Sequence, residues 1–175
     1  MASELRVDRI IPTSGVPTGG GGGIIQIVQA STSTQVNINT QTYTDTGLSA
    51  TITPRFASSK ILMITNHQVY GASDGDNDFY WGIRYLRNST TIFDPVNDTN
   101  GPYDFGMQAY GPSTTRSWYD RCVPPQVLDS PNTTSAVTYK TQARTYRSDY
   151  SGNVRFQYST TTNGTSFITL MEFSG

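Results

Sequence analysis

The residues that could take part in catalysis or metal binding are few and lie far apart along the 175-residue chain. The sequence contains one histidine, His67, and one cysteine, Cys122. His67 lies within an apolar, strand-like run, so we expect a packed, hydrogen-bonded imidazole in the core. Cys122 precedes Val123 and two prolines, which favours a buried strand thiol over a nucleophile. A lone cysteine also excludes an internal disulfide and a cysteine-based metal cluster.

Three aspartates, Asp74, Asp76 and Asp78, alternate as the oxygen ligands of a calcium-binding loop do. The pattern then fails, because Phe79 stands where an EF-hand needs glycine and Tyr85 where it needs glutamate. We therefore expect a solvated acidic turn, and a weak calcium site is the alternative. Four more aspartates could serve as a glycosidase pair, but no pattern orders them: Asp94, Asp98, Asp104 and Asp120. No nucleotide-binding or nucleophile motif occurs, so we expect no enzymatic activity and no cofactor.

Aromatic residues between positions 94 and 131 form the other set with a chemical use. This stretch is irregular and rich in proline, and such a long irregular segment is typically functional or hides further elements. The aromatic side chains could form a surface on which sugars stack, or they could pack against the sheet. These candidate surface-binding residues are Tyr103, Phe105, Tyr110, Trp118 and Tyr119.

Composition places these residues in an all-β protein. Charged residues make up only 14% of the chain, whereas 26 threonines, 18 serines and 11 tyrosines favour pleated strands over helices. Eight to ten strands without a helix indicate an antiparallel β-sandwich of the jelly-roll type. A net charge of −1 without a basic cluster argues against nucleic-acid binding. No apolar run is long enough for membrane insertion, and without a signal peptide we expect folding in a cytoplasm.

The segment from Thr44 to Gly71 is expected to form the central hairpin of this sandwich. Leu48, Ala50 and Ile52 alternate with polar residues in its first strand, and a turn around Pro54 follows. The second strand is apolar on both faces, which is typical of a strand in the middle of a sandwich. One face carries Leu62, Ile64, Gln68 and Tyr70, and the other carries Ile61, Met63, His67 and Val69.

Alternation also predicts the later strands. Phe79 to Arg87 is expected to bury its aromatic face in the core or in a subunit interface. The segments 136–147, 154–159 and 167–173 are expected to form an antiparallel meander that ends at the carboxyl terminus. In the second of these, Val154, Phe156 and Tyr158 are expected on one face and Arg155 and Gln157 on the other.

Residues 1–23 differ from the β-sandwich domain predicted for residues 24–175. Gly19 to Gly23 are five consecutive glycines and predict a flexible joint. Apolar side chains on the preceding segment would be unfavourable in water, so we expect an extended arm that docks onto a particle or a neighbouring subunit. A frayed terminus is the alternative. The candidate docking residues are Leu5, Val7, Ile10 and Ile11.

Three segments carry a resemblance to small β-structured virion proteins of marine and cyanobacterial tailed phages. The run TGLSATITP followed by SSKIL resembles a recurrent segment of these proteins, as do the opening LRVDRIIPTSGVPTGGGGGIIQIVQ and the ending ITLMEFSG. The matching blocks cover both ends and the central segment, roughly 60 residues. Such proteins are tail fibres, head fibres or capsid decoration proteins. The stretch from Ala72 to Pro131 has no such likeness.

The resemblance implies a virion structural protein that assembles in the host cytoplasm. We expect a homotrimer, a fibre-like component whose arm binds a capsid, tail or fibre-base protein and whose domain contacts a host-surface glycan. Apolar residues on both faces of the Phe79 strand also favour a trimer interface. The close alternative is a decoration (cement) protein that stabilises the head. The alternative outside this class is a soluble carbohydrate-binding β-sandwich.

Overall fold

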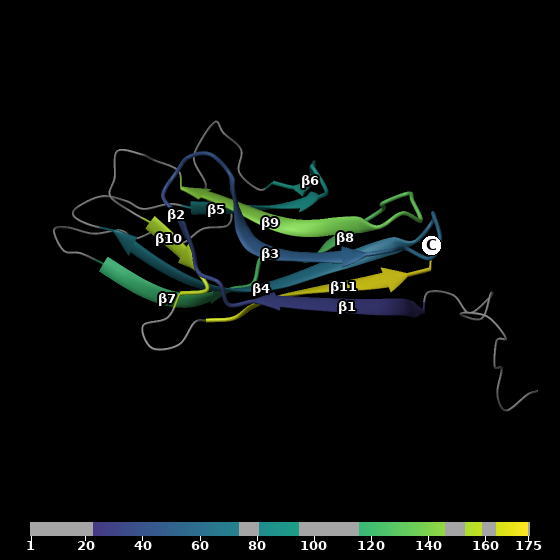
Figure 1. Ribbon diagram of the computed structural model, residues 1–175, viewed down its shortest axis with the longest axis horizontal. Helices are drawn as coiled ribbons and strands as arrows, with labels where there is room; N and C mark the ends of the chain where they lie inside the picture. Colours follow the sequence, from purple (N-terminus) through teal and green to yellow (C-terminus); the bar gives the residue numbers. More distant parts are fainter. Residues whose placement is uncertain (1–22, 74–80, 95–115, 146–152, 159–163, 175) are drawn as a thin grey trace, which may run out of the picture.

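The computed structural model describes residues 23–73, 81–94, 116–145, 153–158 and 164–174, although the side chains of 72, 73 and 116–121 are excluded. These ranges form eleven strands and contain no helix (Figure 1). Seven strands form one sheet: β1 (Ile24–Thr32), β2 (Val36–Ile38), β4 (Lys60–Ser73), β7 (Arg116–Cys122), β8 (Val127–Asp129), β10 (Asn153–Phe156) and β11 (Ser166–Phe173). Four form the other: β3 (Thr44–Ile52), β5 (Trp81–Arg87), β6 (Thr90–Phe93) and β9 (Val137–Thr145).

The two sheets pack face to face as an antiparallel β-sandwich, as the sequence predicted. Strict alternation of side chains produces this packing, because every second residue is buried in β9 and, from Thr46 onward, in β3. β5 buries Trp81, Ile83 and Tyr85, also as predicted. Residues 1–22, including Leu5, Val7, Ile10 and Ile11, lie outside the described residues. The arm and the jelly-roll topology stay predictions.

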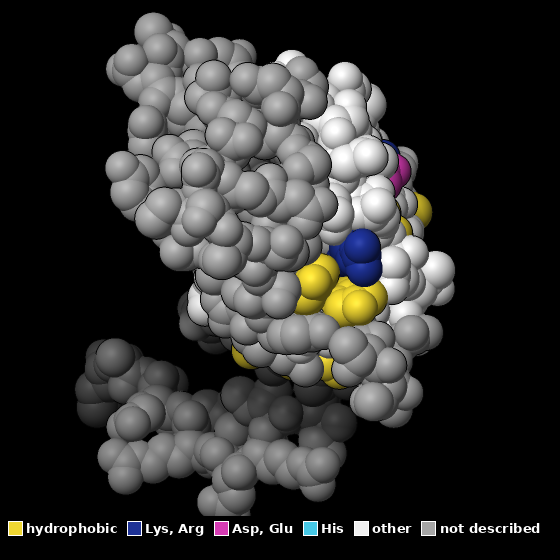
Figure 2. Space-filling model, turned by 90° about the vertical axis from the view of Figure 1, so that its left-hand side faces the viewer, with side chains coloured by type: hydrophobic (Ala, Val, Ile, Leu, Met, Phe, Trp, Pro, Cys, Tyr) yellow, Lys and Arg dark blue, Asp and Glu magenta, His cyan; other side chains and the backbone are white. Residues whose placement is uncertain are grey.

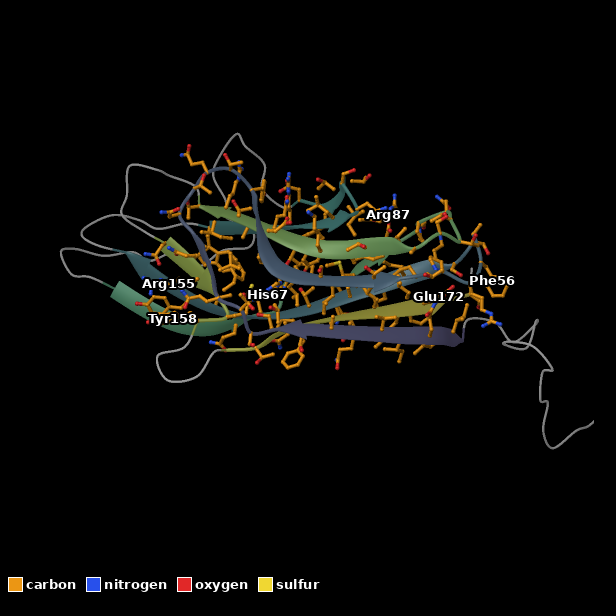
Figure 3. All side chains as sticks on the ribbon, in the orientation of Figure 1. Phe56, His67, Arg87, Arg155, Tyr158 and Glu172 are labelled. Carbon is orange, nitrogen blue, oxygen red and sulfur yellow. The ribbon has the colours of Figure 1, made fainter. Side chains whose placement is uncertain are left out.

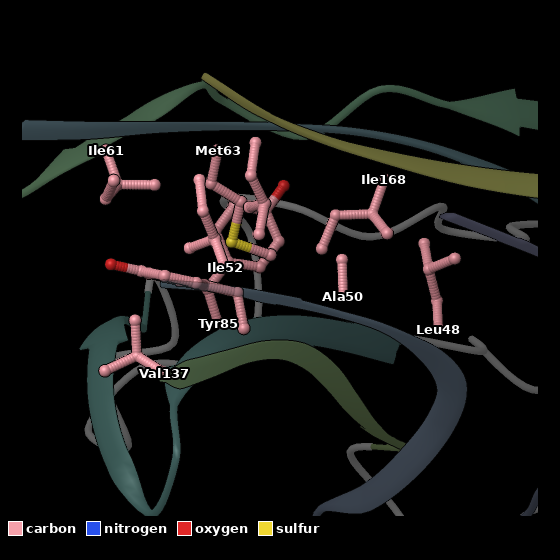
Figure 4. Packing of buried hydrophobic residues seen from close by; sticks show 10 residues of the cluster. Leu48, Ala50, Ile52, Ile61, Met63, Tyr85, Val137 and Ile168 are labelled. Carbon is pink, nitrogen blue, oxygen red and sulfur yellow. The ribbon is translucent and has the colours of Figure 1, made fainter. Parts of the chain in front are cut away.

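The predicted hairpin is wrong: β3 pairs with β9 in one sheet, and β4 pairs with β11 in the other. The connection crosses from sheet to sheet, and the two strands face each other across the core (Figure 4). Glu172 of β11 holds this connection, since its Oε1 accepts hydrogen bonds from Arg55 N and Ser59 Oγ, both at 2.6 Å. Its Oε2 accepts a bond from Gln26 Nε2 of β1 at 2.5 Å.

β4 is the long central strand of the seven-stranded sheet. Along one edge it pairs first with β8 and then with β7. β11 and β10 follow each other along the opposite edge. Gln68 joins their ends, since its N–H donates to Ser166 Oγ and its carbonyl accepts a bond from Gln157 N. The residues of β4 on its inner face are buried, whereas those on its outer face are only half-buried. The prediction of a central strand is confirmed, but its second face lies on the surface of the sandwich.

The predicted carboxyl-terminal meander is also wrong. β9 belongs to the four-stranded sheet, whereas β10 and β11 both pair with β4 rather than with each other. The alternation of apolar side chains fixed which faces are buried but not which edges pair.

Two buried clusters fill the space between the sheets. The first cluster lies toward β1, β3 and β11 and contains Leu48, Ala50, Ile52, Ile61, Met63, Tyr85, Val137, Tyr139, Ile168 and Leu170 (Figure 4). The second cluster lies toward β2 and β10 and contains Ile38, Val69, Trp81, Ile83, Ala143, Val154 and Phe156. The sandwich is therefore divided into two halves along its strands.

Candidate binding surface on the seven-stranded sheet

The outer face of the seven-stranded sheet carries most of the exposed apolar side chains in the described residues. Six large hydrophobic residues are exposed among the described residues, and four of them belong to strands of this sheet: Ile24, Ile27, Leu128 and Phe167. The other two are Phe56, in the β3–β4 connection, and Val123, after β7. Contiguous exposed apolar patches are typical of surfaces at which proteins bind other molecules.

One register row of this face is apolar across four strands. Ile27 of β1 pairs with Met171 of β11, Met171 with Leu62 of β4, and Leu62 with Leu128 of β8. Their neighbours along the strands point into the first cluster, so these four side chains point outward. We call this row, with the exposed Ile24 and Phe167, the apolar half of the face.

The other half of the face carries an aromatic–arginine cluster made of Tyr70, Arg155 and Tyr158. The two tyrosine rings are 4.5 Å apart between centroids and tilted by 40°. The Arg155 guanidinium carbon lies 4.9 Å from the Tyr158 ring centroid and 5.4 Å from that of Tyr70. Figure 3 places Arg155 and Tyr158 at one end of the molecule and Glu172 and Phe56 at the other. Figure 2 shows a basic side chain beside hydrophobic ones at the first end.

Gln157 brings Tyr158 into this cluster. Its φ of 57° is in the left-handed region, so β10 ends at Phe156 and the alternation of side chains breaks. The Gln157 side chain turns inward, where its amide accepts a bond from Ser166 Oγ at 2.8 Å and donates to the Thr34 carbonyl at 3.0 Å. The prediction that Tyr158 shares the face of Val154 and Phe156 is therefore wrong, because this turn reverses the side on which it lies.

Within the described ranges, Arg155 forms no ion pair. Its Nε donates to Asn153 Oδ1 at 3.1 Å, but its terminal nitrogens meet no acceptor among the described residues. Arg87, in contrast, binds both oxygens of Asp129 at 2.9 and 2.7 Å. Arg155 thus offers charged donors beside two aromatic rings, an arrangement that can hold a ring-shaped ligand with a negative charge.

The outer face of the four-stranded sheet has the opposite character, because its charges satisfy one another. Tyr43 lies between two guanidinium groups, 3.9 Å from that of Arg84 and 4.8 Å from that of Arg144. Its hydroxyl donates to Asp94 at 2.8 Å, and burial together with this bond raises the pKa of Tyr43. Nearby, Asp45 accepts bonds from Lys140 at 2.9 Å and Gln142 at 2.6 Å. These bonds lower the pKa of Asp45 although its partial burial opposes them.

His67 is packed in the core as predicted, but it is not hydrogen-bonded as predicted. It is fully buried, its ring lies edge-on to Phe156 at 5.4 Å, and neither ring nitrogen has a partner in the described part of the chain. Burial lowers the pKa of His67 to about 3, so the imidazole is neutral. It cannot reach solvent as a general base. Cys122 packs half-buried against the same second cluster.

The structure brings together only some of the predicted site residues. Tyr119 and Trp118 lie on β7, opposite Tyr70 and Gly71 in the register. Tyr103, Phe105 and Tyr110 lie outside the described residues, as do the calcium candidates Asp74, Asp76 and Asp78. Within the described ranges, no group of three or more His, Cys, Asp or Glu residues is placed to hold a metal ion.

Sequence reasoning missed Tyr70, Arg155 and Tyr158 as a group. Arg155 was expected to face outward, but Tyr70 was assigned to a strand covered on both faces. The pairing of Arg155 with Tyr70 depends on the β10–β4 register, which links residues 85 positions apart. No local signal predicted it.

Comparisons with known proteins add no assignment. No protein-family model matches the chain, and no curated protein matches it. The described residues include no helix that is long and apolar enough to cross a membrane.

Proposed function

We propose that the chain is a structural protein of a phage virion, a trimeric fibre-like component fixed to the particle at one end and facing the host surface with the other. The observation that carries this proposal is the polarity of the sandwich. β1 begins and β11 ends at one end of the long axis, and the aromatic–arginine cluster lies at the opposite end (Figures 1 and 3). An arm formed by residues 1–23 would join at β1. The sequence resemblance to virion proteins supports the same conclusion.

The apolar half of the seven-stranded sheet supports assembly with further copies of this chain. Three strands of seven residues and the three residues of β8, with strands about 4.8 Å apart and about 3.4 Å per residue, give a face of about 400 Å². That is roughly half of the 800 Å² that each partner buries in a standard interface. The row Ile27, Met171, Leu62 and Leu128 carries no charge, so it fits an equally uncharged surface such as its own copy. In a closed threefold ring, the β1 side of one copy would meet the β8 side of the next.

This interface differs from the one that the sequence suggested. Apolar residues on both faces of the Phe79 strand motivated the trimer, but Leu86, on the outer side of β5, is only 5% exposed within its own chain. β5 therefore offers no free apolar face among its described residues, and the interface proposal moves to the other sheet.

The order of strands supports the jelly-roll topology proposed for this class. The chain passes from one sheet to the other between β2 and β3, β3 and β4, β4 and β5, β6 and β7, β8 and β9, and β9 and β10. A jelly roll likewise has two sheets that the chain crosses between repeatedly.

The proposal is tested by immunogold labelling of intact particles with an antibody against residues 153–158. We expect gold at the tips of fibres on the tail or the head. Gold spread evenly over the head would favour the decoration protein, and unlabelled particles would contradict any virion role. Deleting residues 1–18 tests the anchor: the domain should fold unchanged, and its incorporation into particles should be lost. Normal incorporation of the truncated chain would make the segment a frayed end.

A second candidate function is a soluble carbohydrate-binding β-sandwich, which the aromatic–arginine cluster favours. It differs from the virion protein in its assembly state. This alternative expects a monomer whose solubility does not depend on residues 1–23, so light scattering on the full chain separates the two.

A further inference from the structure

We infer that Tyr70, Arg155 and Tyr158 form a binding site for an acidic sugar, a saccharide that bears a carboxylate or a sulfate. This inference rests on the proposed function, since it names the class of ligand at the outward end of the molecule. The three side chains come from β4, β10 and the residue after the Gln157 turn, and all are half-buried on the outer face.

The two tyrosines supply the stacking surface. The C–H face of a sugar ring is apolar and packs on aromatic rings, whereas its hydroxyl groups need polar partners at the edges. The two rings are tilted by 40° to each other, so their planes face in different directions. Asn37 of β2 lies in the same register row, next to Arg155, and can provide a polar partner at the rim.

Arg155 supplies the charge. A guanidinium binds carboxylate and sulfate oxygens through two parallel hydrogen bonds, and aromatic rings beneath it hold its plane in place. Two other guanidinium groups of the sandwich already have anionic partners: Arg84 is 4.0 Å from Asp94, and Arg87 is 2.7 Å from Asp129. Within the described ranges, Arg155 has no carboxylate partner, so a ligand can provide one.

The number of cationic groups on the protein indicates which class of anionic ligand it can bind. Nucleic acids need several phosphate-binding cations, and the chain has a net charge of −1 without a basic cluster. One unpaired guanidinium beside two rings matches a ligand with one anionic group per ring. An acidic saccharide has this composition, whereas a neutral saccharide would leave Arg155 unpaired.

The test is calorimetric and NMR titration of the full-length protein with an oligosaccharide of glucuronic acid, a sulfated disaccharide and a neutral glucose oligosaccharide of equal length. We expect an acidic probe to bind about tenfold or more tightly than the neutral one. Added salt should weaken the acidic complex. Failure of both acidic probes to bind at millimolar concentration, or equal binding of the neutral one, would overturn the inference.

Variants separate charge from stacking. Arg155→Gln should remove the preference for the acidic probe, and Arg155→Lys should restore only part of it because a lysine lacks the planar fork. Tyr158→Ala should weaken both kinds of sugar. The matched control is Arg84→Gln on the opposite face, which should leave binding unchanged. If Arg155→Gln binds the acidic probe like the wild type, the site is elsewhere.

Light scattering on the same samples keeps this inference distinct from the proposed function. A trimer that fails to bind acidic sugar contradicts the site alone. A monomer that binds acidic sugar contradicts the fibre-like assembly and leaves the site standing.

Discussion

The two halves of the sandwich differ in how completely their buried polar groups are hydrogen-bonded. In the half around the first cluster, the buried carboxylates are fully engaged. Glu172 accepts three hydrogen bonds, and Asp129 binds Arg87 and the hydroxyl of Tyr139, whose pKa is raised by burial and by this bond. In the half around the second cluster, buried polar atoms of His67, Trp81 and Thr145 have no partner among the described residues.

The outer face of the seven-stranded sheet divides in the same place. Outside the first cluster it carries the apolar row beside the polar Gln29 and Thr169. Outside the second cluster it carries the aromatic–arginine cluster, whose arginine has no carboxylate partner among the described residues. When all buried polar groups are hydrogen-bonded, this part of the structure is rigid, and a rigid surface suits assembly. Unpaired polar groups cost stability and are typical of regions kept for binding. This difference supports our proposal of a stable base and a recognition end within one domain.

The largest expected effect is the loss of the Glu172 carboxylate. Glu172→Ala leaves three donors from β1 and the β3–β4 connection without an acceptor in a buried position. We expect the free energy of unfolding to fall by about 3–5 kcal/mol. Urea denaturation measures it. Asp45→Ala, which removes an exposed ion pair with Lys140, is the control and should cost less than about 1 kcal/mol. Similar losses for both variants would contradict the contrast between buried and exposed carboxylates.

The second expected effect is a pH dependence that comes from His67. Its folded pKa of about 3 lies below the unfolded value of 6.5, so the unfolded state binds more protons between these values. Stability is therefore complete above pH 6.5 and falls by about 1.4 kcal/mol per pH unit as the pH is lowered toward 3.

Measurements between pH 5.0 and 6.5 isolate this effect from most carboxylates. Over this window, the wild type should lose about 2 kcal/mol of stability, and His67→Leu should lose far less. His67→Leu should also be at least as stable as the wild type at pH 7, because it removes two unpartnered buried nitrogens. An unchanged slope in this variant would mean that another group titrates.

The smallest expected effect is on the recognition end. Arg155→Gln loses two contacts between a guanidinium and a half-exposed ring, so the free energy of unfolding should fall by no more than about 1 kcal/mol. Thermal unfolding monitored by circular dichroism measures it. A loss comparable to that of Glu172→Ala would make Arg155 a structural residue.

The sequence predicted which face of a strand is buried better than it predicted which strands pair. The alternation in β3 and β5 identified their buried side chains correctly because one residue's burial depends on its own strand. Pairing depends on distant segments. Glu172 holds the β3–β4 connection by accepting a bond from Arg55 N, and the two residues are 117 positions apart in the sequence. A five-residue connection after Pro54 suits either a hairpin or a crossing between sheets, so the local pattern could not decide between them.

The aromatic–arginine cluster could not be predicted from the sequence for a different reason. A glutamine in the left-handed region has no sequence signature, unlike Gly47, whose φ of 82° suits the absence of a side chain. Since Gln157 reverses the face of Tyr158, alternation alone placed that ring in the core. The position of Arg155 beside Tyr70 likewise follows from the strand order and not from its neighbours in sequence.

The most direct test of the account is the molar mass of the full chain in solution, measured by light scattering at micromolar concentration. The account predicts three times the 19.2 kDa chain mass for the wild type. Leu128→Asp places a charge on a side chain that is 60% exposed, so the variant should fold and yet be monomeric. Ser49→Asp, on the exposed face of β3 opposite Lys140, is the matched control and should stay trimeric. A monomeric wild type, or a trimer that Leu128→Asp leaves intact, would contradict assembly through the apolar half of the seven-stranded sheet.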